Sequence, residues 1–374
     1  MNNDFKELKI CSRCVLDENI PQIEFNENGE CNYCKIHDES VEIFPTGDAG
    51  QKILLNIVEE IKDKGKNKAY DCIVGVSGGV DSTFTLLNTV KLGLRPLAVQ
   101  FDNGWHSEIA VSNIKNACAK LEVDLHTIVV DWEEFKDILR SFLEASVPDA
   151  DIATDIGIKA TLYRIASEEG LKYIITGANF RTEGQIPRGW TYMDGRYIRS
   201  VQKKFGRMKL KKFPNLTMSQ YLYYMFIKKI KVIKILNYLD YQKDDAKKLL
   251  MDEVGWRDYG GKHYESIYTR FNNGFLCREK FNIDKRKVEF AALVRSGQIT
   301  RTSALENLKN PPYPTDRMQE DVDYVIKKLG FTKEEFEEIF SRPPKSFKDY
   351  PTYYPIIAKL KPVIDFMSRF VTRL

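Results

Sequence analysis

The residues best suited to chemistry form one short run, Ser77-Gly78-Gly79-Val80-Asp81-Ser82. This run follows an apolar stretch, residues 71–76, and precedes a helix-like segment, residues 82–91. Two adjacent glycines let backbone N–H groups approach an anion closely, and the start of a helix adds unpaired N–H donors. The two serine hydroxyls add further donors, and the Asp81 carboxylate suits a divalent cation held against phosphate oxygens. The layout predicts a phosphate or pyrophosphate site, although a glycine pair after a strand is also common as a plain tight turn.

Four cysteines near the start of the chain form two pairs, Cys11 with Cys14 and Cys31 with Cys34. The 16 residues between the pairs fall within the range typical of a four-cysteine zinc site, where four thiolates form a closed tetrahedron. Two disulfides and a redox-active pair are the alternatives. A cytosolic setting disfavours disulfides, and duplication of the motif before any βαβ unit disfavours redox chemistry. We therefore expect structural zinc, in a module with a hairpin turn at Asn28-Gly29.

Apolar and amphipathic segments alternate after this module, in the order expected for βαβ units. The predicted strands and helices alternate over residues 71–76, 83–92, 95–101, 107–121, 125–130, 132–145, 156–169 and 173–176, with two helices before the last strand. This order predicts an α/β fold with a doubly wound parallel sheet covered on both faces. Ligands of such sheets bind beyond the carboxyl ends of the strands, which brings together the residues at those ends: Ser77, Asp102, Asp131 and Gly177.

Other segments have simpler patterns. Residues 40–50 are expected to form a linker, and residues 51–64 an amphipathic helix. Near the end of the chain we expect an acidic helix over residues 321–340 and a basic, aromatic tail within residues 343–374.

Two segments after the predicted sheet could serve binding. Residues 181–199 are rich in Gly, Arg and aromatic residues, the composition of a binding loop, from which Glu183 and Gln185 could reach the sheet edge. Tyr221 to Tyr241 is apolar but contains four lysines that rule out a membrane span. We expect a basic helix there, either packed on the domain with its lysines in water or lying on an anionic membrane surface.

A second dense set of chemically useful residues lies toward the C-terminus. Residues 255–266 read Gly-Trp-Arg-Asp-Tyr-Gly-Gly-Lys-His-Tyr-Glu-Ser, and residues 280–286 read Lys-Phe-Asn-Ile-Asp-Lys-Arg. Fixed basic residues of this kind can neutralise a leaving pyrophosphate. A helical domain with solvated charges would explain most of these lysines, but not the Gly-Gly-Lys-His run between aromatic residues.

Composition excludes several classes of protein. The 374 residues are 43% hydrophobic, so the chain can bury a substantial core and wholesale disorder is excluded. The net charge of +4 is modest and spread out, so we expect no nucleic-acid partner. No signal peptide and no uncharged run of 18 apolar residues is visible, and we expect a cytoplasmic protein without a transmembrane segment.

The run SGGVDS lacks the Walker A ending and the G-x-G-x-x-G spacing. It resembles instead the PP-loop of the N-type ATP pyrophosphatases, which cut ATP between the α and β phosphates and use the AMP half to activate an oxygen. The resemblance implies that Phe101 and Asp102 contact the nucleotide, and the alternative is a plain polar strand end. It also implies that Thr176 and Gly177 approach the α-phosphate. Lys159 could face the same edge or be an ordinary solvated lysine.

With the cysteine module and the runs at residues 256–266 and 280–286, the chain resembles the bacterial N-acetyl sugar amidotransferases of surface-polysaccharide and flagellin-glycan biosynthesis. The resemblance extends from Cys11 to about Tyr313. It implies an ATP-dependent ligase of lipopolysaccharide O-antigen or related glycan biosynthesis. Such an enzyme converts the acetamido group of a sugar, expected to be nucleotide-linked, to an acetamidino group through an adenylated intermediate and ammonia.

This second resemblance also implies roles and partners. Pyrophosphate would be held by the PP-loop residues Ser77, Gly78, Gly79 and Ser82, and Mg²⁺ by Asp81. Charge on the departing pyrophosphate would be stabilised by Lys262 and, less surely, by Lys280, Lys285 and Arg286. No glutaminase domain is visible, so ammonia is expected from separate glutaminase and cyclase-like subunits that resemble imidazole glycerol phosphate synthase.

The same resemblances predict four regions: a zinc-ribbon-like module at 1–45, a PP-loop core at 50–180, an insertion with the basic helix at 181–255, and a helical substrate and pyrophosphate region at 256–374. The rival enzyme is a tRNA thiolation enzyme of the same superfamily, which should show a clustered basic face and a sulfur-relay cysteine near the active edge. The remaining cysteines, Cys72, Cys118 and Cys277, look like ordinary thiols. A second rival is a zinc-ribbon scaffold with a degenerate nucleotide fold.

Overall fold

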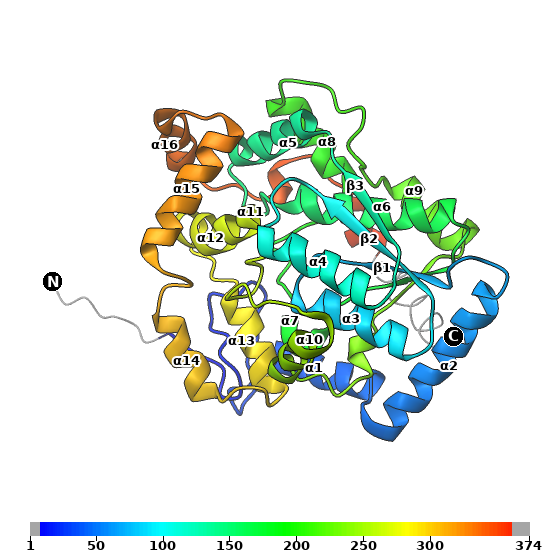
Figure 1. Ribbon diagram of the computed structural model, residues 1–374. Helices are drawn as coiled ribbons and strands as arrows, with labels where there is room; N and C mark the ends of the chain where they lie inside the picture. Colours follow the sequence, from blue (N-terminus) through cyan, green and yellow to red (C-terminus); the bar gives the residue numbers. More distant parts are fainter. Residues whose placement is uncertain (1–7, 361–374) are drawn as a thin grey trace.

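A five-stranded parallel sheet lies at the centre of the computed structural model, which describes residues 8–360 (Figure 1). The strands lie side by side in the order β3-β2-β1-β4-β5. Their bounds are β1 Cys72–Gly75, β2 Pro96–Asp102, β3 Leu125–Val129, β4 Tyr173–Ile175 and β5 Lys231–Ile233. The chain reverses its direction of travel across the sheet between β3 and β4, so the carboxyl ends of β1 and β4 flank a topological switch point.

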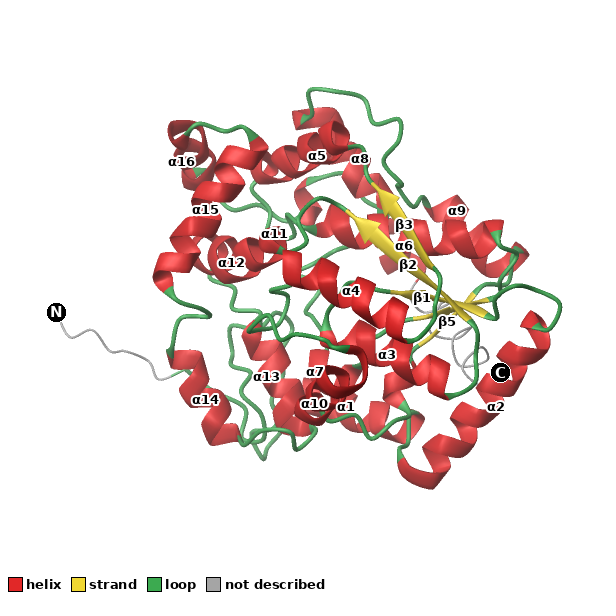
Figure 2. Ribbon diagram, viewed as in Figure 1, coloured by secondary structure: helices red, strands yellow, loops and turns green. Residues whose placement is uncertain are grey.

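Alternate residues of each central strand pack against opposite layers of helices. Figure 2 shows helices on both sides of the sheet. Ile73 packs with one layer and Val74 with the other, the period-two pattern of a strand buried on both faces. One layer holds α2 (Gly47–Gly65), α3 (Val80–Lys91), α4 (Glu108–Lys120) and α10 (Lys243–Val254), and the other holds α6 (Ile152–Glu168) and α9 (Met218–Leu222). The predicted doubly wound α/β fold is confirmed.

Most predicted elements of the core form, with ends that differ by a few residues. The helix predicted over residues 132–145 is α5 (Trp132–Ala145). The linker predicted over residues 40–50 is wrong, because α1 (Asn32–Ile43) continues into it and α2 begins at Gly47. Gly50 lies too close to the Pro45 carbonyl for any Cβ, so the short connection is a tight one.

The helix predicted over Tyr221–Tyr241 is also wrong. The segment divides into a π-helical turn, η1 (Tyr223–Ile227), the edge strand β5, and a 3-10 turn, η2 (Ile235–Asn237). The β-branched residues of β5 pair with β4, and this pairing outweighs helical propensity. The segment was also expected to bury its apolar side chains and leave its lysines in water. This expectation is wrong as well, because the apolar side chains of Phe226 and Ile227 in η1 are exposed.

The rest of the chain forms a helical region beside the sheet, which Figure 1 shows around α11, α12 and α15. Its core joins α5 and α8 (Gly195–Phe205) to four later helices: α11 (Ile267–Phe271), α12 (Cys277–Phe281), α15 (Thr315–Leu329) and α16 (Lys333–Ser341). The single helix predicted over residues 321–340 is therefore wrong. Gly330 ends α15 in a left-handed conformation, φ 72°, which L-residues with a Cβ adopt only at a cost. Of the predicted tail, residues 361–374 lie outside the described part.

The cysteine module packs against α13 (Arg286–Arg295) and α14 (Arg301–Lys309). Lys287 forms an ion pair with Asp17, and the Arg301 guanidinium donates to the carbonyls of Cys11 and Cys14 at 2.9 Å each. The N-terminal cysteine module and the helices α13 and α14 thus share one interface. Within residues 8–360, no helix is both long enough and apolar enough to cross a membrane.

Candidate functional site

A cavity of about 800 Å³ opens at the carboxyl ends of the strands, within the usual size range of small-ligand sites. Its walls include the Ser77–Ser82 loop, the N-terminal part of α6, the turn after β4, the start of α10 and parts of residues 258–290 in the C-terminal region. The two dense motifs found in the sequence, about 180 residues apart, therefore share one cavity.

The Ser77–Ser82 loop brings its donors to one spot. Gly79 caps the N-terminus of α3, and the Ser77 and Ser82 hydroxyl oxygens lie 3.2 Å apart. The Ser77 N–H also donates to Ser82 Oγ, at 3.2 Å. Serine hydroxyls and helix N–H groups that meet in this way can hold the oxygens of a phosphate.

Two glycines make this loop possible. Gly78 has φ +79°, and a Cβ there would lie 2.3 Å from the Ala110 carbonyl oxygen. A Cβ at Gly177, after β4, would lie within 2.9 Å of the backbone of Asp81 and Ser82. The backbone after β4 thus packs directly on the start of α3.

The C-terminal motif holds the loop from outside. Trp256 Nε1 donates to the Gly78 carbonyl at 2.9 Å, and Asn113 Nδ2 donates to both Gly78 O and Arg257 O. The Tyr259 hydroxyl accepts from the Val80 N–H at 3.2 Å, so it occupies one donor at the start of α3. The aromatic residues of the motif position the loop, a role that sequence patterns alone did not assign.

Asp81 lies at the base of the cavity. The Tyr241 hydroxyl donates to Asp81 Oδ1 at 2.5 Å. Burial raises the pKa of Asp81 above its usual value, Glu183 raises it further, and Lys243, the Tyr241 hydrogen bond and Lys262 act in the opposite direction. A bound cation would favour the ionised carboxylate here, because it would offset both burial and the neighbouring negative charge.

The lysines that line the cavity differ in whether their side chains already have an acidic partner. Lys243 pairs with Glu289 at 3.0 Å, and Lys262 and Lys243 lower the pKa of Glu289 although its burial opposes this. Lys262 and Lys285 line the cavity, and their side chains form no ion pair or hydrogen bond with residues 8–360. These two ammonium groups are free to meet an anionic ligand.

Most predicted site residues line the cavity: Ser77, Gly79, Asp81, Ser82, Phe101, Thr176, Gly177, Lys262, Lys285 and Arg286. Three others do not: Gly78, whose carbonyl is held by Trp256, and Asp102 and Lys280. Asp102 accepts from the Gly104 N–H at 2.9 Å and lies 3.8 Å from His106 Nδ1. Asp131, also expected at this edge, caps α5 and pairs with Lys212 outside the cavity.

Two basic residues have local structural partners instead of the expected ligand contacts. Lys280 Nζ donates to the carbonyls of Ile339, Phe340 and Arg342, so it caps the end of α16 far from the PP-loop. Its assignment to pyrophosphate is wrong for this reason. Arg286 does reach the cavity wall, but its guanidinium is engaged by Asp284 and by the Asn310 carbonyl.

Sequence reasoning missed several residues that line the cavity or contact its lining. Tyr241 and Lys243 sat inside or beside a segment predicted as a helix, so no motif marked them. Glu289 lies in a helix without a distinctive pattern. Asp151 and Asp155 lie four residues apart at the start of α6, a spacing that places both on one helix face and could have marked them.

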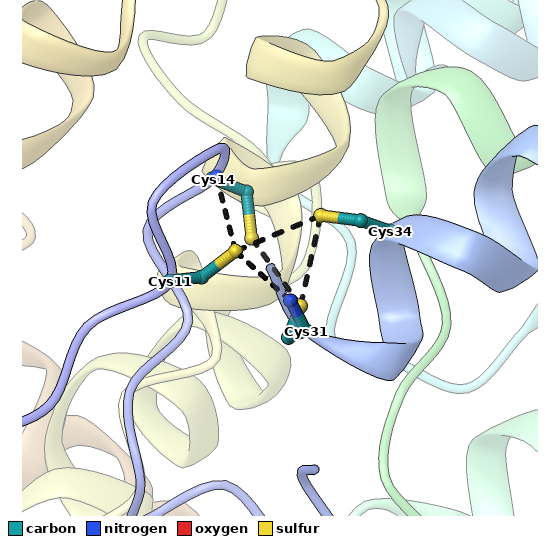
Figure 3. Close-up of side chains that lie close together, drawn as sticks. All are labelled: Cys11, Cys14, Cys31 and Cys34. Carbon is teal, nitrogen blue, oxygen red and sulfur yellow. Dashed lines mark hydrogen bonds between the residues drawn. The ribbon is translucent and has the colours of Figure 1, made fainter. Parts of the chain in front are cut away.

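None of the four clustered cysteines lines the cavity, and the cluster packs against α13 and α14. Figure 3 shows the four side chains close together. The sulfur atoms of Cys11 and Cys34 are 3.8 Å apart, those of Cys14 and Cys31 3.7 Å, and those of Cys31 and Cys34 3.6 Å. Thiolates about 2.3 Å from a tetrahedral zinc lie about 3.8 Å from one another, so the cluster fits zinc. The Cys31 N–H donates to Cys11 Sγ at 3.2 Å, an outer contact that orients this ligand.

Comparisons with known proteins point to two relationships. Curated relatives include the tRNA-specific 2-thiouridylase MnmA of Vesicomyosocius okutanii subsp. Calyptogena okutanii, 31% identical over 128 residues, and that of Aeromonas hydrophila, 30% identical over 137 residues. These matches cover 30% and 33% of this chain and 35% and 37% of the relatives. The chain thus spans about a third of the length of the curated relatives it matches.

Residues 265–361 match the family model described as LPS biosynthesis protein WbpG-like, C-terminal domain. The chain thus resembles MnmA over part of its length and carries a segment that matches the WbpG-like C-terminal domain. This WbpG-like domain begins at Glu265 and includes Arg270, Lys285 and Glu289 of the cavity wall. The ligand cavity is therefore shared between the PP-loop core and the WbpG-like domain.

Solved structures give only loose overlaps. The predicted subunit of a tRNA methyltransferase from Methanocaldococcus jannaschii is 14% identical, with a TM-score of 0.29, over 48% of this chain and 75% of that one. NMN synthetase from Francisella tularensis is 17% identical, with a TM-score of 0.27, over 56% of this chain and 87% of that one.

Proposed function

We propose that this protein is an ATP-dependent N-acetyl sugar amidotransferase of lipopolysaccharide or related surface-glycan biosynthesis. One observation carries the proposal: the SGGVDS loop and the Gly-Gly-Lys-His motif face the same cavity, in a chain with a WbpG-like domain. The reaction would replace the oxygen of a sugar acetamido group by nitrogen.

The phosphate end of the cavity would hold ATP. Ser77, Ser82 and the N–H groups at the start of α3 would bind the β and γ phosphates as they leave. Asp81 would hold Mg²⁺, which offsets the charge on the phosphates. Lys262 is suited to stabilise the pyrophosphate, because it has no carboxylate partner among residues 8–360 to compete for it.

The amide oxygen of the acetamido group must be activated before nitrogen can replace it, and transfer of AMP to this oxygen would do so. An amide oxygen is a poor leaving group, and its transfer to the α-phosphorus converts it to part of AMP, a good leaving group. Ammonia then adds to the carbon and AMP departs. The ammonia would come from separate glutaminase and cyclase-like subunits, a proposal that rests on the family resemblance alone.

The likeness to tRNA-specific 2-thiouridylase MnmA favours thiolation of RNA as a second candidate. In that reaction a thiol near the bound nucleotide would carry the sulfur. All seven cysteines of the chain lie within residues 8–360, and none of them lines the cavity. Cys72, Cys118 and Cys277 are buried, and burial raises the pKa of each thiol above its usual value. These thiols are poor nucleophiles in poor positions, which disfavours the second candidate.

The test is mass spectrometry of N-acetylated and diacetamido sugars, free and nucleotide-linked, incubated with the protein, ATP, Mg²⁺ and ammonium. We expect AMP and a sugar lighter by about one mass unit, because O is replaced by NH. Lys262→Met should lower the rate by roughly 100-fold or more, since it removes charge stabilisation of the transition state. Lys248→Met, at an exposed lysine of α10, is the matched control and should leave the rate near that of the wild type. Absence of AMP with every sugar, together with salt-sensitive tRNA binding, would favour thiolation instead.

A further inference from the structure

The N-terminal part of α6 forms a carboxylate wall of the cavity that the proposed roles leave unused. Asp151 and Asp155 both line the cavity. Asp151 accepts from the hydroxyls of Thr154 at 2.6 Å and Thr269 at 2.7 Å. Asp155 is accessible from the cavity and has no hydrogen bond or ion pair with residues 8–360.

The surroundings of both carboxylates favour their protonated forms. Burial raises the pKa of Asp151 to about 6, and the neighbouring Asp155 adds to the shift. Enclosure by the cavity walls raises the pKa of Asp155, which Lys159, Lys285 and His263 partly oppose. A cationic ligand would relieve this arrangement, because an opposite charge favours the ionised form of both groups.

A buried amide in the same wall points independently to a ligand with N–H groups. Asn272 is 1% exposed and lines the cavity, yet its Oδ1 has no hydrogen-bond partner among residues 8–360. It follows Thr269 by three residues along a helical segment, so it lies on the face that contacts Asp151. A buried acceptor without a partner is unfavourable unless a ligand supplies the donor.

The other charged groups around this wall are already matched or are cations. Arg270 pairs with Asp321, and Lys243 with Glu289. Lys285 acts on both carboxylates and Lys159 on Asp155, and these two ammonium groups would repel a cation, so the two aspartates must offset their charge for a cation to bind. The wall therefore offers acceptors to a small, planar, N–H-bearing cation.

We infer that Asp151, Asp155 and Asn272 bind the acetamido group as it becomes cationic during the reaction, an inference that rests on the proposed function. The acetamido group is neutral at the start. Its oxygen forms a bond to the α-phosphorus as the bond to pyrophosphate breaks, which leaves a cationic O-adenylated imidate. Ammonia then forms a bond to the carbon, the C–O bond breaks with its electron pair going to AMP, and one proton is released. The product is an amidinium cation.

The wall would thus favour the two charged states over the neutral substrate. Interactions that strengthen as charge develops accelerate a reaction, whereas those equally strong in the ground state do not. An amidinium presents its N–H groups in one plane, as a guanidinium does, and carboxylates bind such forks well. Asp151 and Asp155 would stabilise the positive charge that develops on the reacting amide group, while Lys262 would stabilise the negative charge on the phosphates.

Two small probes test the inference without ATP: acetamidinium and its neutral isostere acetamide. Each is titrated into the full-length protein and followed by ligand-observed NMR. We expect wild-type protein to bind acetamidinium at least about tenfold more tightly than acetamide, as charge-assisted hydrogen bonds predict. Asp155→Asn and Asp151→Asn should each reduce this preference, and the double variant should abolish it. Asparagine keeps an acceptor for Thr154 and Thr269, so the fold is maintained.

Glu168→Gln, at an exposed carboxylate at the far end of α6, is the matched control and should retain the preference. Equal binding of the two probes, or a preference that survives in the double variant, would overturn the inference. AMP formation from ATP and an N-acetylated sugar is measured separately. If the protein forms AMP and amidine but does not prefer acetamidinium over acetamide, only this inference is overturned and the proposed function stands. One that prefers acetamidinium but forms no AMP supports a cation subsite and contradicts the proposed function.

Discussion

The Asp81 carboxylate is enclosed by the cavity base beside Glu183, and both conditions raise its pKa. The folded state therefore favours the protonated acid. Stability from this group is complete below the pKa of an unfolded aspartate, about 3.9, and is lost as the pH rises above that value toward the raised folded pKa. Ionisation of this side chain in the folded state therefore works against folding, which is a common condition for a residue retained for a ligand.

We accordingly predict that Asp81→Asn stabilises the ligand-free protein. Its melting temperature should exceed that of the wild type by a few degrees at pH 7.5, and the difference should shrink as the pH falls toward about 3.9, the pKa of an unfolded aspartate. The Tyr241 hydroxyl can still donate to the amide oxygen. Differential scanning fluorimetry across this pH range measures the effect.

Asp124→Asn serves as the control, because Asp124 is a surface acid bonded by the Tyr70 hydroxyl and lies outside the cavity. A variant Asp81→Asn that melts lower than the wild type at pH 7.5 would show that the ionised form is favoured without any ligand. The assignment of Asp81 to a cation would then lose its electrostatic support.

At the scale of elements, the loop between β1 and α3 depends on a close backbone contact. We predict that Gly78→Ala destabilises the protein by about 2–5 kcal/mol, the sum of roughly 1–2 kcal/mol for a left-handed alanine and about 1–3 kcal/mol for overpacking. The overpacking arises because the new Cβ would meet the Ala110 carbonyl. Urea unfolding followed by circular dichroism gives this number.

Gly297→Ala isolates the backbone contribution. Gly297 has a similar φ, +70°, but no atom lies within 4 Å of the position of its Cβ. It should therefore lose only about 1–2 kcal/mol. Equal losses for the two variants would mean that the contact of the loop with α4 is unimportant.

The cysteine module makes a separate prediction. Purified protein should contain about one zinc per chain, and Cys11→Ser should lose most of the metal and fold poorly, because structural zinc contributes directly to folding free energy. Metal content by mass spectrometry and melting temperature are the measurements. Cys118→Ser, at a buried thiol of α4 outside the cluster, should keep its zinc. Full zinc content in Cys11→Ser would contradict a four-cysteine site.

Elements with strong local signals were predictable. The strand-helix alternation from residue 71 to 176 gave the sheet and its ligand-binding edge, and the C-x2-C spacing gave the cluster. The strand β5 was not predictable, because its three pairing residues lie in an apolar, lysine-rich segment that suits a helix equally well. Lys280 was misplaced for a similar reason: its three carbonyl partners lie about 60 residues further along the chain.

At the scale of the whole molecule, the cavity joins regions that are far apart in sequence. Trp256 and Tyr259 hold the loop of residues 77–82, and the WbpG-like domain supplies Lys285. The cysteine module reaches the same domain through Arg301. Local patterns reveal the individual motifs but not their meeting, since that depends on packing between distant helices. Asp151, Asp155 and Asn272 gain their importance only through this packing.

The central claim is that the amide oxygen of a sugar acetamido group becomes an oxygen of AMP. The most direct measurement uses an N-acetylated sugar whose acetamido oxygen carries a heavy isotope, incubated with the protein, ATP, Mg²⁺ and ammonium. We predict that the AMP formed carries the heavy oxygen in a one-to-one ratio with the amidine. AMP of ordinary mass, or ADP in place of AMP, would contradict the account.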